Sequence, residues 1–315
     1  VNTIVLSNTY ALFDGPARFQ VDQLLRYRQK GFQFTAAYKR GGWDGFVQLM
    51  RANGSFPAGL ASWVAQRLAQ QGIPLDIDDQ RPPDLPMLPE IAGLPHTIKL
   101  RPHQVDAVAA AEREGRGIIH HPTAAGKTEV MIELAHRLAR PGLVLVHRKD
   151  LLNQTTERFI QRLGLGRSLK DFADQDVVGI VGDGHWRPKL ITVATFQTLY
   201  RRLKEKDKQV TRWLKEGIAQ VHVDEVHHLP AKSYELVMAC LTSARWRYGY
   251  SATPWKEGDI ETYFRVAAWI GPTIHQVTPE ELTEQGRLVP ADVFMLDMPA
   301  PQVNYHDWPA AVRYG

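Results

Sequence analysis

The 315-residue chain contains a single cysteine, Cys240. One cysteine cannot form an intrachain disulfide, so the sequence gives no sign of an oxidising compartment. No apolar run reaches the roughly 18–20 residues that a membrane-spanning helix needs. The first residues, VNTIVLSNTYALFDG, lack a basic segment followed by an apolar one, which argues against a signal peptide. We therefore expect a cytoplasmic protein without a membrane partner.

A strong charge of one sign is also absent. The chain has 38 lysines and arginines and 34 aspartates and glutamates, which gives a formal net charge of +4. This mildly basic balance permits a polyanionic partner but does not demonstrate one. Apolar residues make up 44% of the chain and charged residues 23%, an ordinary composition for a protein that buries a core. The length favours two domains over one.

One stretch lacks any hydrophobic periodicity. Residues 74–95, PLDIDDQRPPDLPMLPEIAGLP, are rich in proline and acidic residues. Proline removes a backbone donor and stops helices, so this stretch predicts an extended linker that divides the chain near residue 90. Before it, strand-like residues 4–6 and 45–49 and helical residues 21–29 and 59–71 predict a small α+β domain over residues 1–90.

After the linker, short apolar strands alternate with amphipathic helices. We expect helices over residues 100–113, over 129–139 and from 149, and strands over 117–120, 142–147, 177–181, 190–194, 219–223 and 246–250. This alternation predicts an α/β fold in which a parallel sheet is covered by helices on both faces. We assign residues 91–285 to this domain.

A phosphate-binding loop is indicated, although its first glycine is missing. Residues 120–130 read HHPTAAGKTEV, and the pattern G-x-x-x-x-G-K-[ST] would place a glycine where His121 stands. The GKT turn lies between an expected strand and an expected helix, where backbone amides and a helix N-terminus face an anion. There Lys127 would reach the β- and γ-phosphates, and the Thr128 hydroxyl would bind Mg²⁺. On its own, the turn is equally compatible with a surface loop.

Two further segments make the nucleotide interpretation stronger. Residues 221–228, VHVDEVHH, form an apolar strand that ends in two carboxylates. Because Mg²⁺ prefers oxygen ligands, Asp224 would hold the metal, and Glu225 would orient and deprotonate the attacking water. YSATP at 250–254 ends another strand, where hydroxyl residues can sense the acidic pair. We assign coupling to His228, Ser251 and Thr253.

In this order, GKT, DEVH and SAT resemble the first RecA-like domain of superfamily 2 helicases and translocases. That family writes its loop as P-T-x-x-G-K-[ST] after a small residue, so HPTAAGKT departs only at His121, either as a packing variant or as a group that titrates near the phosphates. LRPHQVDAV at 100–108 resembles the upstream motif whose glutamine reads adenine. The resemblance implies ATP and Mg²⁺ as cofactors, with ATP contacts from Arg101, Gln104, Pro122, Thr123, Ala124, Ala125, Gly126, Lys127 and Thr128.

Other segments resemble nucleic-acid contacts of the same family. LVLVHRKDLLNQ at 143–154 and ITVATFQTL at 191–199 resemble the motifs that touch the DNA backbone. The contacts implied are His147, Arg148, Gln154, Thr195 and Gln197. AYKRGGWDGFVQLM at 37–50, followed by GSFPAGL at 54–60, resembles the N-terminal domain of UvsW-like recombination helicases. Lys39 and Arg40, beside its Y-x-x-G-x-W-D-G core, would bind duplex backbone.

The segment after YSATP resembles the end of the first motor domain in UvsW-like and XPB-like enzymes. GRLVP at 286–290 resembles the crossing into a second motor domain. We therefore expect residues 286–315 to begin a domain whose remainder is absent, and the chain alone to be weakly active or inactive. The N-terminal resemblance favours DNA over RNA.

The resemblance implies an ATP-dependent DNA helicase or branch-migrating translocase for recombination, repair or replication forks. Its DNA partner would be duplex, forked or branched. Two alternatives stay open. One is a restriction- or nuclease-linked subunit that translocates on duplex DNA. The other is an ATP-binding, DNA-binding module without motor activity.

Overall fold

The larger sheet is built from the strands that follow residue 100. In this computed structural model, which describes residues 1–95, 97–166, 175–228, 232–256 and 258–286, its eight strands run in the order β10-β9-β11-β8-β12-β13-β7-β14. Their bounds are β7 (Arg116–His120), β8 (Gly142–Val146), β9 (Val178–Gly182), β10 (His185–Arg187), β11 (Ile191–Thr195), β12 (Gln220–Asp224), β13 (Trp246–Ser251) and β14 (Thr273–Gln276). All neighbouring strands are parallel except β9 and β10.

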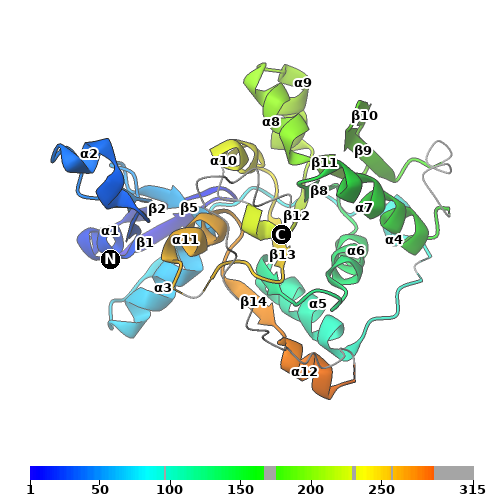
Figure 1. Cartoon of the computed structure of the whole chain (residues 1–315), viewed down its shortest axis with the longest axis horizontal. Helices are drawn as coiled ribbons and strands as arrows, with labels where there is room; N and C mark the ends of the chain where they lie inside the picture. The colour runs from blue at the N-terminus through cyan, green and yellow to red at the C-terminus, as the bar shows by residue number, and fades with distance from the viewer. Residues whose placement is uncertain (96, 167–174, 229–231, 257, 287–315) are drawn as a thin grey trace, which may run out of the picture.

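Helices cover both faces of this sheet (Figure 1). Those described are α5 (Pro102–Glu114), α6 (Lys127–Leu138), α7 (Lys149–Arg162), α8 (Phe196–Lys204), α9 (Lys208–Glu216), α10 (Lys232–Cys240), α11 (Ile260–Trp269) and α12 (Pro279–Glu284), with a short 3-10 helix η4 (Val226–His228). Alternate residues of one strand enter different cores: Leu145 packs with the α8–α11 side, and Val144 with the α5–α7 side. Two covered faces explain the continuous apolar strands. The expected α/β fold, a flanked parallel sheet after a small N-terminal domain, is confirmed.

The N-terminal domain has its own mixed sheet. Its strands run in the order β5 (Ser55–Pro57), β2 (Tyr10–Asp14), β1 (Thr3–Leu6) and β6 (Asp76–Asp79), and a separate hairpin pairs β3 (Arg26–Arg28) with β4 (Phe46–Gln48). The helical segments are α1 (Arg18–Leu24), η1 (Phe32–Phe34), α2 (Ala36–Lys39), η2 (Ala58–Leu60) and α3 (Ala61–Gln70). The helix predicted over residues 21–29 is wrong for its last part, because Arg26–Arg28 is a strand. Tyr27 is buried between two more exposed arginines, the period-two pattern of a strand.

The prediction of an extended linker over residues 74–95 is also wrong in two places. Asp76–Asp79 forms β6, which pairs in parallel with β1 at the edge of the sheet. All four residues of β6 are exposed, so the strand carries no hydrophobic pattern. Farther on, α4 (Pro89–Ala92) buries Ile91 in the core of the larger domain. The crossing expected at 286–290 and the domain expected over 286–315 lie outside the described residues, apart from Gly286.

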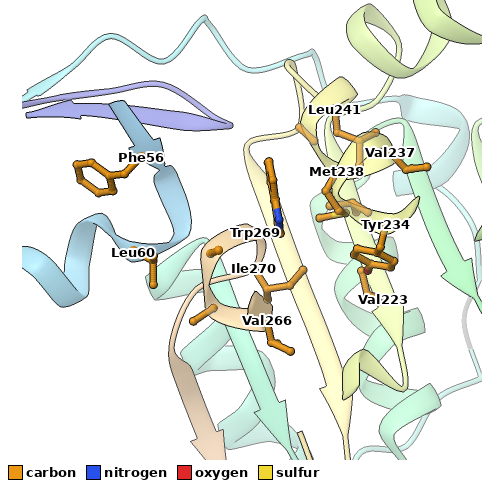
Figure 2. Packing of buried hydrophobic residues seen from close by; sticks show 14 of the residues in the cluster. Phe56, Leu60, Val223, Tyr234, Val237, Met238, Leu241, Val266, Trp269 and Ile270 are labelled. Atoms are coloured by element: carbon orange, nitrogen blue, oxygen red, sulfur yellow. The ribbon is translucent and has the colours of Figure 1, made fainter. Parts of the chain in front are cut away.

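Helix α11 of the larger domain lies against the N-terminal domain, where it contacts η2 and β3 (Figure 1). One continuous buried cluster runs from Phe56 and Leu60 of the N-terminal domain, past Trp269 and Ile270, to Met238 of α10 (Figure 2). The backbone of η2 lies against the end of α11: a Cβ placed on Gly59 would be 2.0 Å from the Ala267 carbonyl oxygen. The N-terminal domain is therefore seated directly on the larger domain. No helix among the described residues is long and apolar enough to cross a membrane.

Candidate nucleotide site

The predicted motifs meet at one edge of the larger sheet. Strands β7, β13, β12, β8 and β11 are neighbours, and all five run in the same direction. Their carboxyl ends lead into the GKT loop, the SAT segment, the DEVH segment, His147 and Thr195, respectively. Ligands of parallel α/β sheets bind at this edge. Strand order thus brings together segments that are up to 130 residues apart in the sequence, from His121 to Ser251.

The GKT loop is held by α5 as well as by its own helix. Lys127 is the first residue of α6, and its Nζ donates to the carbonyl oxygens of His121 at 3.2 Å and Pro122 at 3.4 Å. The Ala125 carbonyl oxygen lies 3.0 Å from both His103 Nε2 and Gln104 Nε2. Of the loop residues, Thr123 and Ala124 are exposed and Thr128 is half-buried.

Gln104 is buried, and both ends of its amide contact backbone. Nε2 donates to the loop, and Oε1 accepts from the backbone N–H of Arg101 at 2.8 Å. In this structure Gln104 therefore braces the loop, and its role toward adenine stays a prediction. His103 makes the same contact and was not predicted from the sequence. The only sequence signal for it is its place beside Gln104 in the first turn of α5.

His121 is a buried packing residue. Its Nε2 lies 2.8 Å from Nδ1 of His275 on β14, and its ring meets His103 edge-on at 5.6 Å. Burial lowers the pKa of His121 to about 3, and the nearby His275, His103, Lys127 and His120 add to this effect. The imidazole is therefore neutral at physiological pH. His121 stands where the loop pattern has its first glycine. Of the two roles considered for His121, the structure favours packing over titration beside a phosphate.

This depressed pKa predicts a destabilising effect of acid. In the unfolded chain His121 gains a proton as the pH falls through its ordinary value of 6.5, whereas in the folded chain it stays neutral to about 3. Stability due to His121 is thus present above pH 6.5 and is lost as the pH falls, by up to about 1.4 kcal/mol per pH unit. His121→Ala should be less stable at pH 7.5, because of a cavity, but should depend less steeply on pH. Urea unfolding at pH 7.5, 6 and 5 tests this.

The matched control for that test is His185→Ala, which removes an exposed histidine of β10. If the stability of His121→Ala and that of His185→Ala depend on pH equally steeply, His121 is not the group responsible for the loss of stability in acid.

Asp224 and Glu225 form a close carboxylate pair at the end of β12. The Glu225 backbone N–H donates to Asp224 Oδ1 at 3.1 Å. Burial, and then the charge of Glu225, raises the pKa of Asp224 to about 6, while Lys127 acts in the opposite direction. Glu225 has a φ of 49°, in the left-handed region. Such strained residues occur often at functional sites.

His227 connects this pair to the SAT segment. Its Nδ1 lies 3.3 Å from Glu225 Oε2 and 2.9 Å from Ser251 Oγ, and the Thr253 backbone N–H donates to the same Oγ at 3.1 Å. This contact is made by His227, which the sequence did not single out, and the coupling role of His228 stays a prediction. The 3-10 turn of η4 buries Val226 and brings His227 to β13, whereas the His228 ring lies 4.1 Å from that of His147.

Two residues at this edge are of the kind that could hold a magnesium ion. Thr128 at the start of α6 and Asp224 at the end of β12 offer a hydroxyl and a carboxylate, the hard oxygen donors that Mg²⁺ takes. The described residues contain no cluster of three or more His, Cys, Asp or Glu that could hold a metal. This set suits an ion that takes one or two protein ligands and completes its shell with phosphates and water.

The expected DNA-contact residues divide into two kinds. Arg148, Gln154 and Gln197 are exposed, and Gln197 Nε2 donates to the His147 carbonyl oxygen at 2.9 Å. Thr195 is buried, with its hydroxyl 2.8 Å from that of Thr198. A pocket of about 340 Å³ opens beside them, lined by His147, Gln197, Asp224, Glu225 and His228 with the aromatic residues Phe196, Tyr200 and Tyr234. This pocket joins the expected DNA-contact segments to the carboxylate pair. Lys39 and Arg40 are exposed at the end of α2, in the other domain.

Two family models match separate parts of the chain. Residues 97–256 match the family described as type III restriction enzyme, res subunit, and residues 7–78 match DNA helicase UvsW, N-terminal. The chain belongs to the res-subunit family of superfamily 2 helicases. The first match spans the GKT, DEVH and SAT segments, and the second spans the Y-x-x-G-x-W-D-G core. The resemblance to superfamily 2 helicases with a UvsW-like N-terminal domain is confirmed.

The individual relatives of this superfamily 2 helicase are consistent with the two family matches. The DNA 3'-5' translocase XPB2 of Sulfurisphaera tokodaii is 34% identical over 185 residues, which cover 59% of this chain and 37% of that protein. The ATP-dependent DNA helicase uvsW of Enterobacteria phage T4 is 23% identical over 286 residues, covering 83% of this chain and 53% of that protein. A crystal structure of the UvsW helicase from bacteriophage T4 matches with a TM-score of 0.65 at 19% identity, over 86% of this chain and 98% of that chain, which shows a shared fold. The chain spans about half or less of the length of these two protein relatives.

Proposed function

We propose that this superfamily 2 helicase is an ATP-dependent DNA helicase or branch-migrating translocase that acts in recombination, in repair or at replication forks. The named relatives are DNA helicases and translocases, and the N-terminal match is to UvsW. The location that suits this work is the cytoplasm. The observation that carries the proposal is the contact of His227 with both Glu225 and Ser251. It joins a catalytic carboxylate to a segment on another strand, as a motor that couples hydrolysis to movement requires.

Each residue of the phosphate site has a distinct chemical role in this proposal. Lys127 exchanges its contacts with loop carbonyls for the β- and γ-phosphates of ATP, supported by the backbone N–H groups of residues 123–128. Thr128 and Asp224 would hold Mg²⁺, which neutralises phosphate charge. Glu225 accepts a proton from the attacking water, and His227, beside its Oε2, holds this carboxylate in place. Gln104 and Arg101 would contact the adenine side.

DNA would pass beside the pocket that Asp224 and Glu225 line. Exposed Arg148, Gln154 and Gln197 are proposed to contact backbone phosphates, together with His147. Thr195 would contribute indirectly, because its side chain is buried. Since the pocket beside them reaches Glu225, a change at the DNA side can be transmitted to the carboxylates. Lys39 and Arg40 are the proposed contacts of the N-terminal domain.

ATP binding by Lys127 is the first experimental test. Lys127→Ala removes the ammonium that faces the phosphates, and a charge-assisted contact of this kind is worth roughly 1.5–3 kcal/mol. We expect ATP affinity to fall by roughly 10- to 150-fold. The measurement is isothermal titration calorimetry with Mg·ATP.

Lys149→Ala is the matched control, because Lys149 is likewise the first residue of a helix that follows a strand of the same sheet, here β8. It should bind ATP as the parent does. Equal affinity of the parent and Lys127→Ala would show that the GKT loop is not the nucleotide site, and would favour a turn without that function.

A second candidate function is favoured by the family description. The larger match is to the res subunit of type III restriction enzymes, so a restriction- or nuclease-linked subunit that moves on duplex DNA is the alternative. Such a motor displaces a third strand from a duplex but does not separate a fork. Fork unwinding would support the first proposal, and triplex displacement without unwinding the second. An ATP-binding module without motor activity would do neither.

A further inference from the structure

The β3–β4 hairpin carries two arginines stacked on one aromatic ring. The guanidinium carbons of Arg26 and Arg28 lie 4.6 and 4.8 Å from the centre of the Phe46 ring. Arg28 also lies 4.8 Å from the centre of the Phe32 ring. Alternation along β3 explains the arrangement, because Tyr27 points to the buried side while its two neighbours share the other face. The result is a pair of cations held on a rigid aromatic support, which we name the arginine strip.

Neither guanidinium of the arginine strip has a carboxylate within ion-pair distance in the described part of the chain. The acidic side chains beside the hairpin have other contacts: Asp44 Oδ1 accepts the backbone N–H of Phe46, and Asp22 Oδ1 accepts Gln48 Nε2. Two like charges against one ring repel each other, and an anion placed between them relieves this repulsion. Guanidinium is also the cation that best fits the planar pair of oxygens of a phosphate.

The UvsW-type sequence motif builds the support for this strip. Trp43 Nε1 donates to the Phe46 carbonyl oxygen at 2.7 Å, which fixes the turn before β4. A Cβ on Gly45 would lie 2.4 Å from the Phe32 ring, and the φ of Gly45 is +86°, so only glycine lets Phe32 pack here. Phe32 in turn meets Tyr38 edge-on at 4.7 Å. The motif therefore shapes the hairpin, and the cationic side chains lie on the neighbouring strand β3.

The strip lies next to the larger domain. On the buried side of the hairpin, Tyr27 stacks on Phe264 of α11 at 5.9 Å, and the Lys30 backbone N–H donates to Glu261 at 2.8 Å. A hollow of about 460 Å³ is lined by residues 28–33 together with residues 256 and 258–261, the segment that follows SAT. An anion on Arg28 would thus sit at the rim of a hollow that the motor segment also lines. This position suits a DNA strand that touches both domains.

We propose that Arg26 and Arg28 are the principal DNA-phosphate contacts of the N-terminal domain, and that they bind the backbone of duplex DNA at a fork or branch. The inference rests on the proposed function and names the site where its N-terminal domain holds DNA. Residues two apart on a strand are about 6.6 Å apart, so each guanidinium takes its own phosphate. Lys39 and Arg40 are exposed at the end of α2, and no aromatic ring of the described residues supports them, so they must be ordered on binding at a cost in side-chain entropy.

The test is titration of a forked DNA with the 1–315 chain at several salt concentrations. The Arg26→Gln/Arg28→Gln variant should bind at least tenfold more weakly, and its plot of log K against log salt should be shallower by up to about 1.8 units, since each duplex phosphate neutralised contributes about 0.9. Phe46→Leu keeps both charges but removes the ring, so it should lower affinity while largely keeping the slope. Lys39→Ala/Arg40→Ala should change both quantities less than the Arg26/Arg28 variant.

Arg67→Gln is the matched control, because Arg67 also stacks on an aromatic ring, that of Trp63, but on α3. It should bind DNA as the parent does. Thermal melts of every variant establish that the fold is intact. A folded Arg26→Gln/Arg28→Gln variant with parental affinity and slope would overturn the proposal, as would an equal loss in Arg67→Gln.

Failure of the inference can be separated from failure of the proposed function. ATP affinity is measured on the same variants, and it should be unchanged, because the strip is not part of the phosphate site. If the strip variants bind DNA normally while Lys127→Ala loses ATP, only the strip assignment fails. If Lys127→Ala keeps ATP affinity while the strip variants lose DNA, the proposed motor function fails and the strip stands.

Discussion

Glu225→Gln should stop ATP hydrolysis while ATP binding continues. The amide fills the same space and keeps the hydrogen-bonding reach of the side chain, but it cannot take a proton from water. Loss of a general base lowers turnover by roughly 10²–10⁴-fold. The measurement is steady-state ATP turnover with DNA, in whichever form of the protein shows DNA-stimulated activity, with calorimetry of Mg·ATP binding beside it.

The control for this variant is Glu235→Gln, the same substitution at an exposed position of α10. It should turn over ATP like the parent. Unchanged turnover in Glu225→Gln would remove Glu225 from the reaction. A parallel loss of ATP affinity would instead mean that this carboxylate serves binding, for instance as a metal ligand in place of Asp224.

The sequence was most informative where a motif follows a strand. Asp224 and Ser251 directly follow expected strands, and Lys127 follows another one after the loop of residues 121–126. Parallel strands deliver their carboxyl ends to the same edge. Their convergence therefore follows from the fold class alone. The contact made by His227 was not predicted, because it depends on one 3-10 turn. The backbone geometry of this turn decides whether His227 or His228 faces β13, and the sequence VHH does not reveal that geometry.

The N-terminal domain was harder to predict because its signals are local and short. Strand β6 consists of DIDD, whose exposed acidic residues look like linker composition, and only pairing with β1 makes it a strand. Arg26 and Arg28 fell inside an expected helix, where they would not share a face. Their stacking on Phe46 requires β3 to pair with β4. Arg28 and Phe46 are 18 residues apart in the sequence, and no local sequence pattern predicts this pairing.

Gly59→Ala should destabilise the chain through the contact between its two domains. The added Cβ would lie 2.0 Å from the Ala267 carbonyl oxygen and 2.6 Å from that of Ala268, and both are backbone atoms that cannot rotate away. Because the φ of Gly59 is not in the left-handed region, the substitution itself causes no local strain. The loss, roughly 1–3 kcal/mol as for an overpacked core, would thus come from separating η2 from α11. Chemical unfolding and thermal melts measure it.

Gly42→Ala is the matched control, since its Cβ would meet only the Ala37 carbonyl oxygen at an ordinary 3.7 Å. Its stability should equal that of the parent. The effect of Gly59→Ala should also reach the nucleotide site, because Ile270, just after α11, and Val226 of η4 both pack on Gly249. Val226 stands between Glu225 and His227, so a displaced α11 should lower ATP turnover as well as stability. Parental stability in Gly59→Ala would show that the N-terminal domain does not sit on α11, and a loss of stability with unchanged turnover would show that this contact holds the domains together without positioning Glu225.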